Sequence, residues 1–268
     1  MKRLVIDCGA TKTDWLLSDG RSIQTPGFNL AHTPESTLQE ILGDAARQLG
    51  GGIDEIYLYA AGLVGAPPVD LGRWFPGSRV EYASDMLGAA RAVCGREKGI
   101  AAIIGTGANT CQWDGQKMLR QIHSGGFIIG DEGSASVLGK LFVADFIKGL
   151  VPSTMADALA AHGPADYASL VHKIYLAAAP ARFLGGMAPL ILSFYDREEY
   201  ARNLVDNNFR RFFERTVRRY DPLPLGVVGG FGYACRHILR RIGEEEYGIP
   251  FIGIVPSPLE GLLKYHGI

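Results

Sequence analysis

Several features that would fix the class of a protein at once are scarce or missing in this chain. It has only four cysteines in 268 residues, scattered without the Cys-x-x-Cys or Cys/His spacing of metal sites. We therefore expect reduced, mostly buried thiols and a cytoplasmic location. No apolar stretch approaches the roughly 20 residues that cross a bilayer. We also expect no signal peptide, because a strand is expected within a few residues of Met1 and no charged, then apolar segment with a cleavage site precedes it.

Charge and motif absences exclude further classes. The formal net charge is −1, with 21% charged and 47% hydrophobic residues, which is typical of a globular protein. Neither a nucleic-acid surface nor an anionic-membrane surface is indicated. The chain also lacks the Gly-x-x-x-x-Gly-Lys-Ser/Thr phosphate loop and an intact Gly-x-Gly-x-x-Gly after a strand. A P-loop enzyme and a Rossmann dehydrogenase are therefore disfavoured.

What the chain does contain is one local plan, used twice. An apolar run leads into a Gly/Thr turn, a second strand and an Asp-Gly hairpin turn. The plan first covers residues 4–13 and closes at 19–20, and it returns over 100–110 and closes at 114–115. Backbone N–H groups in such turns suit phosphate oxygens. We predict two related lobes, each offering one turn to a nucleotide held between them.

The remaining pattern predicts an α/β protein in which each lobe has three antiparallel strands and then helix–strand units. Strands are expected at 3–8, 12–18, 21–25, 56–60, 79–83, 100–104, 109–113, 117–122, 225–228 and 250–254. Helices are expected at 34–49, 68–75, 84–94, 134–148, 197–219, 231–242 and 259–265, with a helical insertion at about 152–195. The lobes are placed at 1–98 and 99–268, with ligands in the cleft between them.

Two carboxylates stand where nucleotide chemistry would need them. Asp7 ends the first strand at the Gly/Thr turn, where it could hold Mg²⁺ directly or through water. The alternative is a turn-forming aspartate. Asp85 follows Ser84 at a helix start, and the helix N-terminus stabilises its anion. From position alone, an ordinary first-turn aspartate explains Asp85 equally well.

Five segments, in order along the chain, resemble the sugar kinase and ATPase superfamily that includes actin and hexokinase. Within it, the chain looks most like the N-acetylglucosamine kinase-like branch, the BadF/BadG/BcrA/BcrD ATPase family. The segments are Asp7–Thr13, Ser84–Ala90, Ile104–Asn109, Gly125–Ser134 and Val228–Gly230. The Gly-Asp-Glu-Gly-Ser stretch of the fourth is the most specific. The first departs from the family pattern, which usually has Gly where this chain has Cys8 or Ala10.

The resemblance implies two ribonuclease H-like (actin-like ATPase) lobes, each a mixed five-stranded sheet with flanking helices. It implies Mg²⁺-dependent phosphoryl transfer from ATP to a sugar hydroxyl, with Asp85 as general base and Asp7 as magnesium ligand. Expected phosphate or nucleotide contacts are Gly9, Thr11, Lys12, Gly105, Thr106, Gly107, Gly229 and Gly230. Expected acceptor contacts are Asn29, Asp85, Gly125, Gly126 and Asp131. Glu132 is expected to cap the following helix through the Gly133 and Ser134 amides.

The reaction and its acceptor stay open at this point. The first hypothesis is a kinase acting on N-acetylglucosamine or a related amino sugar or hexose. Phe127 and Ile128 replace the more polar or aromatic contacts of amino-sugar kinases, which leaves another acceptor open. The second is an ATPase activator of the 2-hydroxyacyl-CoA dehydratase or benzoyl-CoA reductase type, but Cys111 and Cys235 lack its iron–sulfur context. The third is a nucleotide-gated binding module, which would not need Asp85.

The expected partners follow from the first hypothesis. We expect ATP and a small sugar or amino sugar as ligands and Mg²⁺ as cofactor, with no nucleic acid and no membrane. A homodimer is expected only by likeness to the family.

Overall fold

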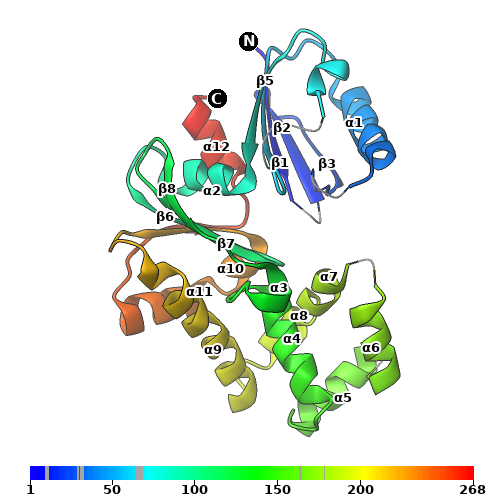
Figure 1. Ribbon diagram of the computed structural model, residues 1–268, viewed down its shortest axis with the longest axis vertical. Helices are drawn as coiled ribbons and strands as arrows, with labels where there is room; N and C mark the ends of the chain where they lie inside the picture. The colour runs from blue at the N-terminus through cyan, green and yellow to red at the C-terminus, as the bar shows by residue number, and fades with distance from the viewer. Residues whose placement is uncertain (10–11, 29, 31–32, 64–68, 163–164, 178) are drawn as a thin grey trace. The chain divides into compact units, whose positions relative to one another are not determined.

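The computed structural model describes residues 1–9, 12–28, 30, 33–63, 69–162, 165–177 and 179–268 (Figure 1). Contacts divide the chain into two compact units. Unit 1 comprises Met1–Glu97, Asp114–Met118 and Ser257–Ile268, and unit 2 comprises Lys98–Trp113 and Leu119–Pro256. The sequence-based division assigned residues 257–268 to the second lobe, whereas they pack with unit 1.

Unit 1 is built on a five-stranded sheet in the order β3-β2-β1-β4-β5. The strands are β1 (Arg3–Cys8), β2 (Lys12–Leu17), β3 (Ser22–Pro26), β4 (Glu55–Ala60) and β5 (Arg79–Ser84). The first three strands form an antiparallel meander. In contrast, β4 runs parallel to β1, and β5 runs parallel to β4. The carboxyl ends of β1, β4 and β5 therefore lie at one edge of the sheet.

Helices cover both faces of this sheet, as Figure 1 shows: α1 (Glu35–Leu49) on one, and α2 (Asp85–Cys94) with α12 (Leu259–His266) on the other. A single turn of 3-10 helix, η1 (Leu71–Arg73), lies between β4 and β5. Strand alternation divides the apolar residues between two cores. Leu4 and Ile6 pack on the α1 side, and Val5 packs with Leu262 of α12.

Unit 2 repeats the sheet in the order β10-β9-β6-β7-β8. Its strands are β6 (Gly99–Ile104), β7 (Ala108–Trp113), β8 (Met118–Ile122), β9 (Leu225–Val228) and β10 (Phe251–Val255). β7 is antiparallel to β6, whereas β9 runs parallel to β6 and β10 parallel to β9. Strand for strand, β6 takes the place of β1 and β8 that of β3. The prediction of two mixed five-stranded sheets with flanking helices is confirmed.

Unit 2 carries most of the helices. They are α3 (Gly126–Ile129), α4 (Ala135–Phe146), α5 (Ser153–His162), α6 (Tyr167–Tyr175), α7 (Pro180–Gly185), α8 (Ala188–Ser193), α9 (Glu199–Arg215), the 3-10 turn η2 (Val217–Arg219), α10 (Gly230–Ala234), α11 (Arg236–Arg241) and the π-helix η3 (Ile242–Glu246). The single helix expected over 197–219 ends at Arg215 because Thr216 leaves helical geometry and its hydroxyl bonds the Phe212 carbonyl. The helix expected over 231–242 is broken at Cys235.

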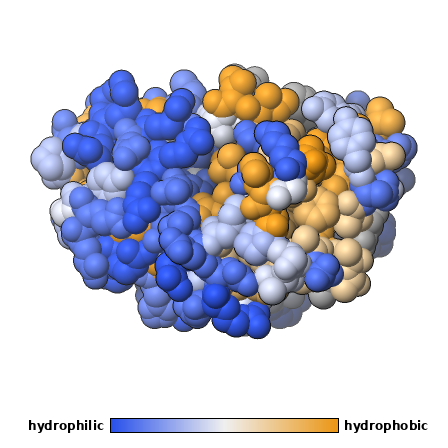
Figure 2. Space-filling view, turned by 90° about the horizontal axis from the view of Figure 1, so that it is seen from below, coloured by the Kyte–Doolittle hydropathy of each residue, from blue (hydrophilic) through white to orange (hydrophobic). Residues whose placement is uncertain are grey.

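Large apolar side chains stay exposed on α3, just after α4, and in the helical insertion. They are Ile128, Ile129, Ile147, Leu150, Tyr167, Tyr175 and Leu176. Several of them border a groove of about 770 Å³ among α3, α4, α6 and α7. Figure 2 shows a face on which hydrophobic and hydrophilic residues gather on different sides. Among the described residues, no helix is both long and apolar enough to cross a membrane.

Candidate active site

Two carboxylates oppose each other across the β1–β2 hairpin of unit 1. Asp7 and Asp14 are direct partners in the antiparallel register, so their side chains leave the same face of the sheet. Burial raises the pKa of Asp7 to about 7, the Asp14 and Asp85 carboxylates add to this rise, and Lys12 opposes it. The site is therefore short of positive charge, which is the condition a divalent cation relieves.

Asp14 also organises the neighbouring polar groups. Its Oδ2 lies 2.7 Å from Lys12 Nζ, and its Oδ1 accepts a 2.6 Å hydrogen bond from Gln24 Nε2. The Lys12 side chain stays 55% exposed. Lys12 thus stands on the face that carries Asp7, paired but reachable. Asp14 had no predicted role, although the register of a tight hairpin between the first two strands places it opposite Asp7.

Asp85 is the first residue of α2, directly after β5. Ser84 Oγ caps the helix by accepting from the Leu87 N–H at 3.2 Å, as expected. Burial raises the pKa of Asp85, and hydrogen bonds from the Met86 and Asp85 amides oppose the rise. Within the described residues, no side chain competes for this carboxylate. It is oriented by the main chain but not neutralised, as a general base requires.

The first Gly/Thr turn uses its own donor. The Gly9 N–H donates to the Lys12 carbonyl at 3.0 Å, closing the hairpin. Such turn amides were expected to be free for phosphate, but the Gly9 amide is already engaged. Thr11 and Asn29, the expected phosphate and acceptor ligands, lie outside the described residues.

The second turn is held by the start of α4. The Gly105 N–H donates to the Gly107 carbonyl at 2.9 Å, so this amide too is engaged. The Ala135 and Ser136 amides donate to the Gly105 and Thr106 carbonyls at 3.0 and 3.1 Å. In the described part of the chain, the amides of Thr106 and Gly107 have no partner. They are the donors left for an anion.

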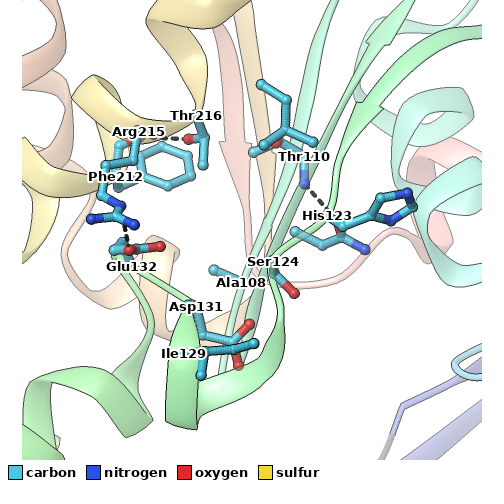
Figure 3. Close-up of a pocket in the computed structure, with 13 residues that line it drawn as sticks. Ala108, Thr110, His123, Ser124, Ile129, Asp131, Glu132, Phe212, Arg215 and Thr216 are labelled. Atoms are coloured by element: carbon cyan, nitrogen blue, oxygen red, sulfur yellow. Dashed lines mark hydrogen bonds and ion pairs between the residues drawn. The ribbon is translucent and has the colours of Figure 1, made fainter.

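A cavity of about 160 Å³ lies close to this turn, within unit 2 (Figure 3). Its walls include Asn109 and Ser124 from the sheet side, Asp131 and Glu132 from the Gly-rich loop at residues 125–134, and Phe212 and Arg215 from α9. Asn109, which sequence analysis did not single out, uses its carbonyl oxygen to accept from the Thr110 amide and Gln121. Its NH₂ group has no partner among the described residues.

Asp131 joins the cavity to the second turn. An added Cβ at Gly107 would lie 3.0 Å from Asp131 Oδ2, so turn and carboxylate are in near contact. The carboxylate accepts from the Ser124 hydroxyl and the Ala108 amide, and burial raises its pKa. A carboxylate has further lone pairs to offer a ligand hydroxyl. Gly130 lines this cavity, whereas the expected Gly125 and Gly126 form the left-handed entry to α3.

The expected helix-capping role of Glu132 is wrong. Glu132 Oε1 lies 2.6 Å from Arg215 Nε, and the two side chains form part of the cavity wall. The Gly133 amide instead donates a hydrogen bond to Asn208 Oδ1 at 3.0 Å. Ser134 Oγ caps α4 by accepting a hydrogen bond from the Val137 amide. Arg215 had no sequence signal, because it is one of several arginines on α9.

The two expected nucleotide glycines differ in their surroundings. Gly229 has a φ of +129° and donates its N–H to the Val255 carbonyl at 2.9 Å. An added Cβ there would lie 2.4 Å from the Ile104 carbonyl oxygen, so close packing of β6 requires this glycine. At Gly230 an added Cβ would meet open space. Only Gly230 therefore offers a bare backbone to a ligand.

The duplicated sheet, the Gly/Thr turn after the first strand of each copy and the carboxylates at one turn define the class of actin-like ATPase folds. No protein-family model and no curated protein sequence matches the chain. Among solved structures, a presumed N-acetylglucosamine kinase from Porphyromonas gingivalis is 35% identical, with a TM-score of 0.88 and 98% of each chain covered.

More distant structures share the fold. A presumed N-acetylglucosamine kinase from Chromobacterium violaceum is 21% identical, with a TM-score of 0.72 over 98% of each chain. A ROK-family glucokinase from Streptomyces griseus, solved with glucose and AMPPNP, is 15% identical, with a TM-score of 0.58 over 99% of this chain and 98% of that one. The chain belongs to the N-acetylglucosamine kinase-like family of sugar kinases.

Proposed function

We propose that this protein transfers the γ-phosphoryl group of ATP to a hydroxyl of N-acetylglucosamine or a related amino sugar or hexose. The observation that carries the proposal is the Asp131 carboxylate, which stands in a polar cavity in near contact with the Gly105–Gly107 turn. Acceptor and phosphoryl donor need such neighbouring sites. The 35% identical relative supports the same reaction class.

The acceptor pocket is the cavity of unit 2. Its wall presents the Asp131 carboxylate, the Asn109 NH₂ group and hydroxyls, beside the apolar ring of Phe212. A polyhydroxylated ligand requires both hydrogen-bond donors and hydrogen-bond acceptors beside an apolar surface, because each of its hydroxyls both donates and accepts a hydrogen bond. In this proposal, Asp131 accepts a hydrogen bond from one hydroxyl of the sugar, and the Asn109 NH₂ group donates a hydrogen bond to a second sugar oxygen.

Asp85 acts as general base and also orients the acceptor hydroxyl. Its raised pKa makes the carboxylate a stronger base than an exposed aspartate, and main-chain amides hold it in place. Proton removal from the attacking hydroxyl contributes on the order of 10²–10⁴ in rate. Asp85 belongs to unit 1, and the residues that line the acceptor pocket belong to unit 2.

Asp7 holds Mg²⁺, directly or through water. A half-buried carboxylate whose pKa is raised by burial and by two neighbouring carboxylates fits a cation with oxygen ligands. Bound there, Mg²⁺ would neutralise charge on the ATP phosphates. Among the described residues no group of three or more metal-ligating side chains occurs. Mg²⁺ in nucleotide sites needs only one or two carboxylates, since phosphates and water complete its shell.

The phosphates take their remaining contacts from the two turns. Thr106 and Gly107 supply free amides, Lys12 supplies charge, and Gly230 offers open backbone to the nucleotide. The amides of Gly9 and Gly105 already form hydrogen bonds within the turns. These two glycines therefore contribute by letting the phosphates approach the backbone closely, and not by donating hydrogen bonds to them. The homodimer and the cytoplasmic location expected from the sequence stay predictions.

The ATPase-activator alternative requires exposed cysteine thiolates to hold an iron–sulfur cluster. All four cysteines are buried, and burial raises the pKa of Cys235 to about 12. A neutral buried thiol is a poor metal ligand. The kinase proposal is therefore the better supported of the two.

The test is an acceptor panel with product identification. Purified protein is incubated with MgATP and each of glucose, glucosamine, N-acetylglucosamine and N-acetylmannosamine, and ADP release is followed. We expect ADP release that depends on the acceptor, and a phosphorylated sugar detected by mass spectrometry. Equal ADP release with and without every acceptor would refute the proposal and favour a plain ATPase.

A further inference from the structure

The Gly-rich loop that carries Asp131 has an unusual backbone. Asp131 has a φ of +56°, and it is the single non-glycine residue with positive φ in the described part of the chain. Gly125, Gly126 and Gly133 also have positive φ values, and an added Cβ at Gly130 would lie only 1.4 Å from the Ser124 carbonyl oxygen. Such a backbone persists only where its surroundings determine it. The loop therefore needs outside support.

Lys140 of α4 supports the first half of the loop. Its Nζ donates to the Phe127 carbonyl at 2.5 Å and lies 3.5 Å from the Ile128 carbonyl. These are end carbonyls of α3, a one-turn helix that cannot satisfy them itself. Asp131 and Glu132 also attract the ammonium group. Lys140 therefore fixes the segment that leads directly into Asp131.

Asn208 of α9 supports the second half. It is completely buried, with its Oδ1 accepting from the Gly133 amide at 3.0 Å and its Nδ2 donating to the Ser134 carbonyl at 3.1 Å. The Ser134 amide in turn donates to the Asp131 carbonyl at 3.0 Å. One buried amide thus holds the turn that begins at Asp131.

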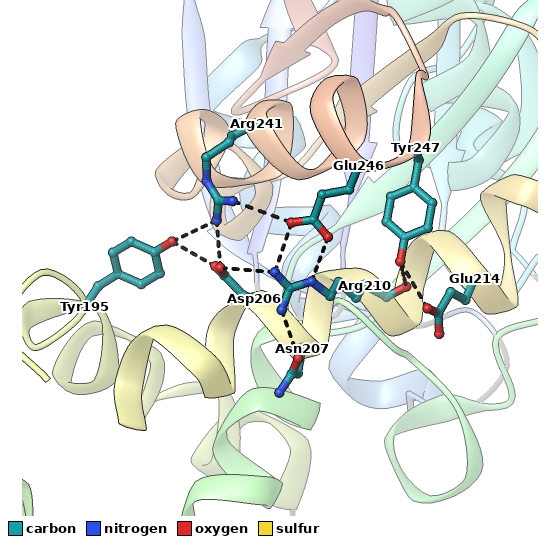
Figure 4. A network of polar contacts seen from close by, with 8 residues as sticks. All are labelled: Tyr195, Asp206, Asn207, Arg210, Glu214, Arg241, Glu246 and Tyr247. Atoms are coloured by element: carbon teal, nitrogen blue, oxygen red, sulfur yellow. Dashed lines mark hydrogen bonds and ion pairs between the residues drawn. The ribbon is translucent and has the colours of Figure 1, made fainter. Parts of the chain in front are cut away.

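The helix that carries Asn208 is itself anchored by a polar network (Figure 4). Asp206 accepts from Tyr195 at 2.8 Å and from Arg241 at 2.7 Å, and Arg210 forms a two-bond pair with Glu246 at 2.7 and 2.9 Å. These contacts tie α9 to α11, η3 and the end of the helical insertion. Asn208 therefore acts from a rigid element.

We propose that Lys140 and Asn208 are positioning residues for the acceptor: they hold the Gly-rich loop so that the Asp131 carboxylate stays in the cavity beside Gly107. The inference rests on the proposed function for the identity of the ligand, but not for the clamp itself. Neither residue lines the cavity, so each acts through the loop rather than on the sugar.

Lys140 carries the test, because replacing the fully buried Asn208 also threatens folding. Lys140→Met removes the ammonium but keeps the stem, and Lys140→Arg restores a donor. Lys148→Met, at an exposed site just after α4, is the matched control. For each protein we would measure the KM for the acceptor, the KM for MgATP, and hydrogen exchange of the amides between Ser124 and Ser134.

For Lys140→Met we expect at least a tenfold higher acceptor KM and at least tenfold faster exchange in the loop. The KM for MgATP should stay within twofold, and Lys140→Arg should recover most of the acceptor affinity. The control should match the wild-type protein in every measurement. A clamp that only stabilises the fold would instead lower the melting temperature and change both KM values alike.

Unchanged loop exchange in Lys140→Met overturns the proposal, and so does an equal rise of both KM values. If the wild-type protein phosphorylates no sugar, the proposed function has failed, and loop exchange still decides the clamp. Faster exchange in Lys140→Met then supports it, and unchanged exchange rejects it.

Discussion

The two sheets share one strand order but carry different side chains at equivalent positions. In unit 1 the β1–β2 register pairs Asp7 with Asp14, whereas in unit 2 the β6–β7 register pairs Ile103 with Asn109. The pair of carboxylates has thus become an apolar residue and a neutral amide. Unit 2 instead presents free amides at its turn and a carboxylate from the loop after β8.

In the proposed function, this difference gives the two copies of the sheet different chemical roles. A carboxylate pair repels phosphate unless a cation intervenes, so unit 1 is suited to Mg²⁺ and to base catalysis. Neutral donors attract phosphate directly, so unit 2 is suited to grip the phosphoryl group and the acceptor. We expect variants in the two units to fail in different ways.

The largest expected effect is that of Asp85→Asn in unit 1. Amide replacement removes the base but keeps size and hydrogen bonding, so kcat should fall about 10²–10⁴-fold. The KM for ATP should change less than threefold. Steady-state kinetics on the best acceptor checks this, with Asp44→Asn on the exposed side of α1 as the control. Near-normal turnover in Asp85→Asn would remove Asp85 from the mechanism.

Gly105→Ala in unit 2 should show the next largest effect. An added Cβ there meets no protein atom within 4 Å and the residue has no positive φ, so the fold should tolerate it. A bound phosphate would meet the new methyl group, and we expect the KM for ATP to rise roughly tenfold, about 1.4 kcal/mol. Gly51→Ala, equally open in the structure, is the control. An unchanged KM would show that this turn does not approach phosphate.

Asp7 should make the ligand-free protein less stable as the pH rises. Its pKa is about 7 when folded against 3.8 ordinarily, so between pH 4 and 7 the folded state keeps a proton that the unfolded state has lost. The free energy of unfolding should fall through that window, by on the order of 2–4 kcal/mol. Urea unfolding at several pH values should show a flatter profile for Asp7→Asn. Parallel profiles for the two proteins would contradict the assigned environment.

His266, at the end of unit 1, should show the smallest effect and the opposite sign. Burial lowers the pKa of His266 to about 4, with Arg91 adding to the shift. Between pH 6.5 and 4 the unfolded state gains a proton that the folded state refuses, so stability should fall as the pH drops. After solvent screening we expect about 1 kcal/mol.

His266→Phe is the variant for this measurement. It keeps an aromatic ring against Tyr57, whose centroid lies 3.6 Å from the imidazole. In His266→Phe, the free energy of unfolding should fall less between pH 6.5 and 4 than it does in the wild-type protein. An identical acid-side decline would argue against the packing of the last helix in unit 1.

The sequence predicted the sheets well because strand alternation, Asp-Gly turns and helix caps are local signals. The cap at Ser84 and the strand before Asp85 follow from a few neighbouring residues. Contacts over long distances in sequence could not be read in this way. The Glu132–Arg215 pair and the Asn208 bonds to Gly133 and Ser134 join residues more than 70 positions apart.

Two further differences have physical reasons. No helix was among those expected at residues 126–129, yet Lys140 satisfies the end carbonyls of α3 and allows one turn. Amides of the Gly/Thr turns were expected to be free. In each tight turn, however, the first amide donates a hydrogen bond to a carbonyl of the same turn, at Gly9 and again at Gly105. Roles assigned to Thr11 and Asn29 stay predictions.

The most direct test of the division between units is acceptor binding without nucleotide. N-acetylglucosamine, or the best acceptor found, would be titrated by calorimetry into wild-type, Asp85→Asn and Asp131→Asn proteins. We expect Asp85→Asn to bind the acceptor within threefold of wild type, whereas Asp131→Asn should bind it at least tenfold more weakly. Full affinity in Asp131→Asn together with lost affinity in Asp85→Asn would contradict this division.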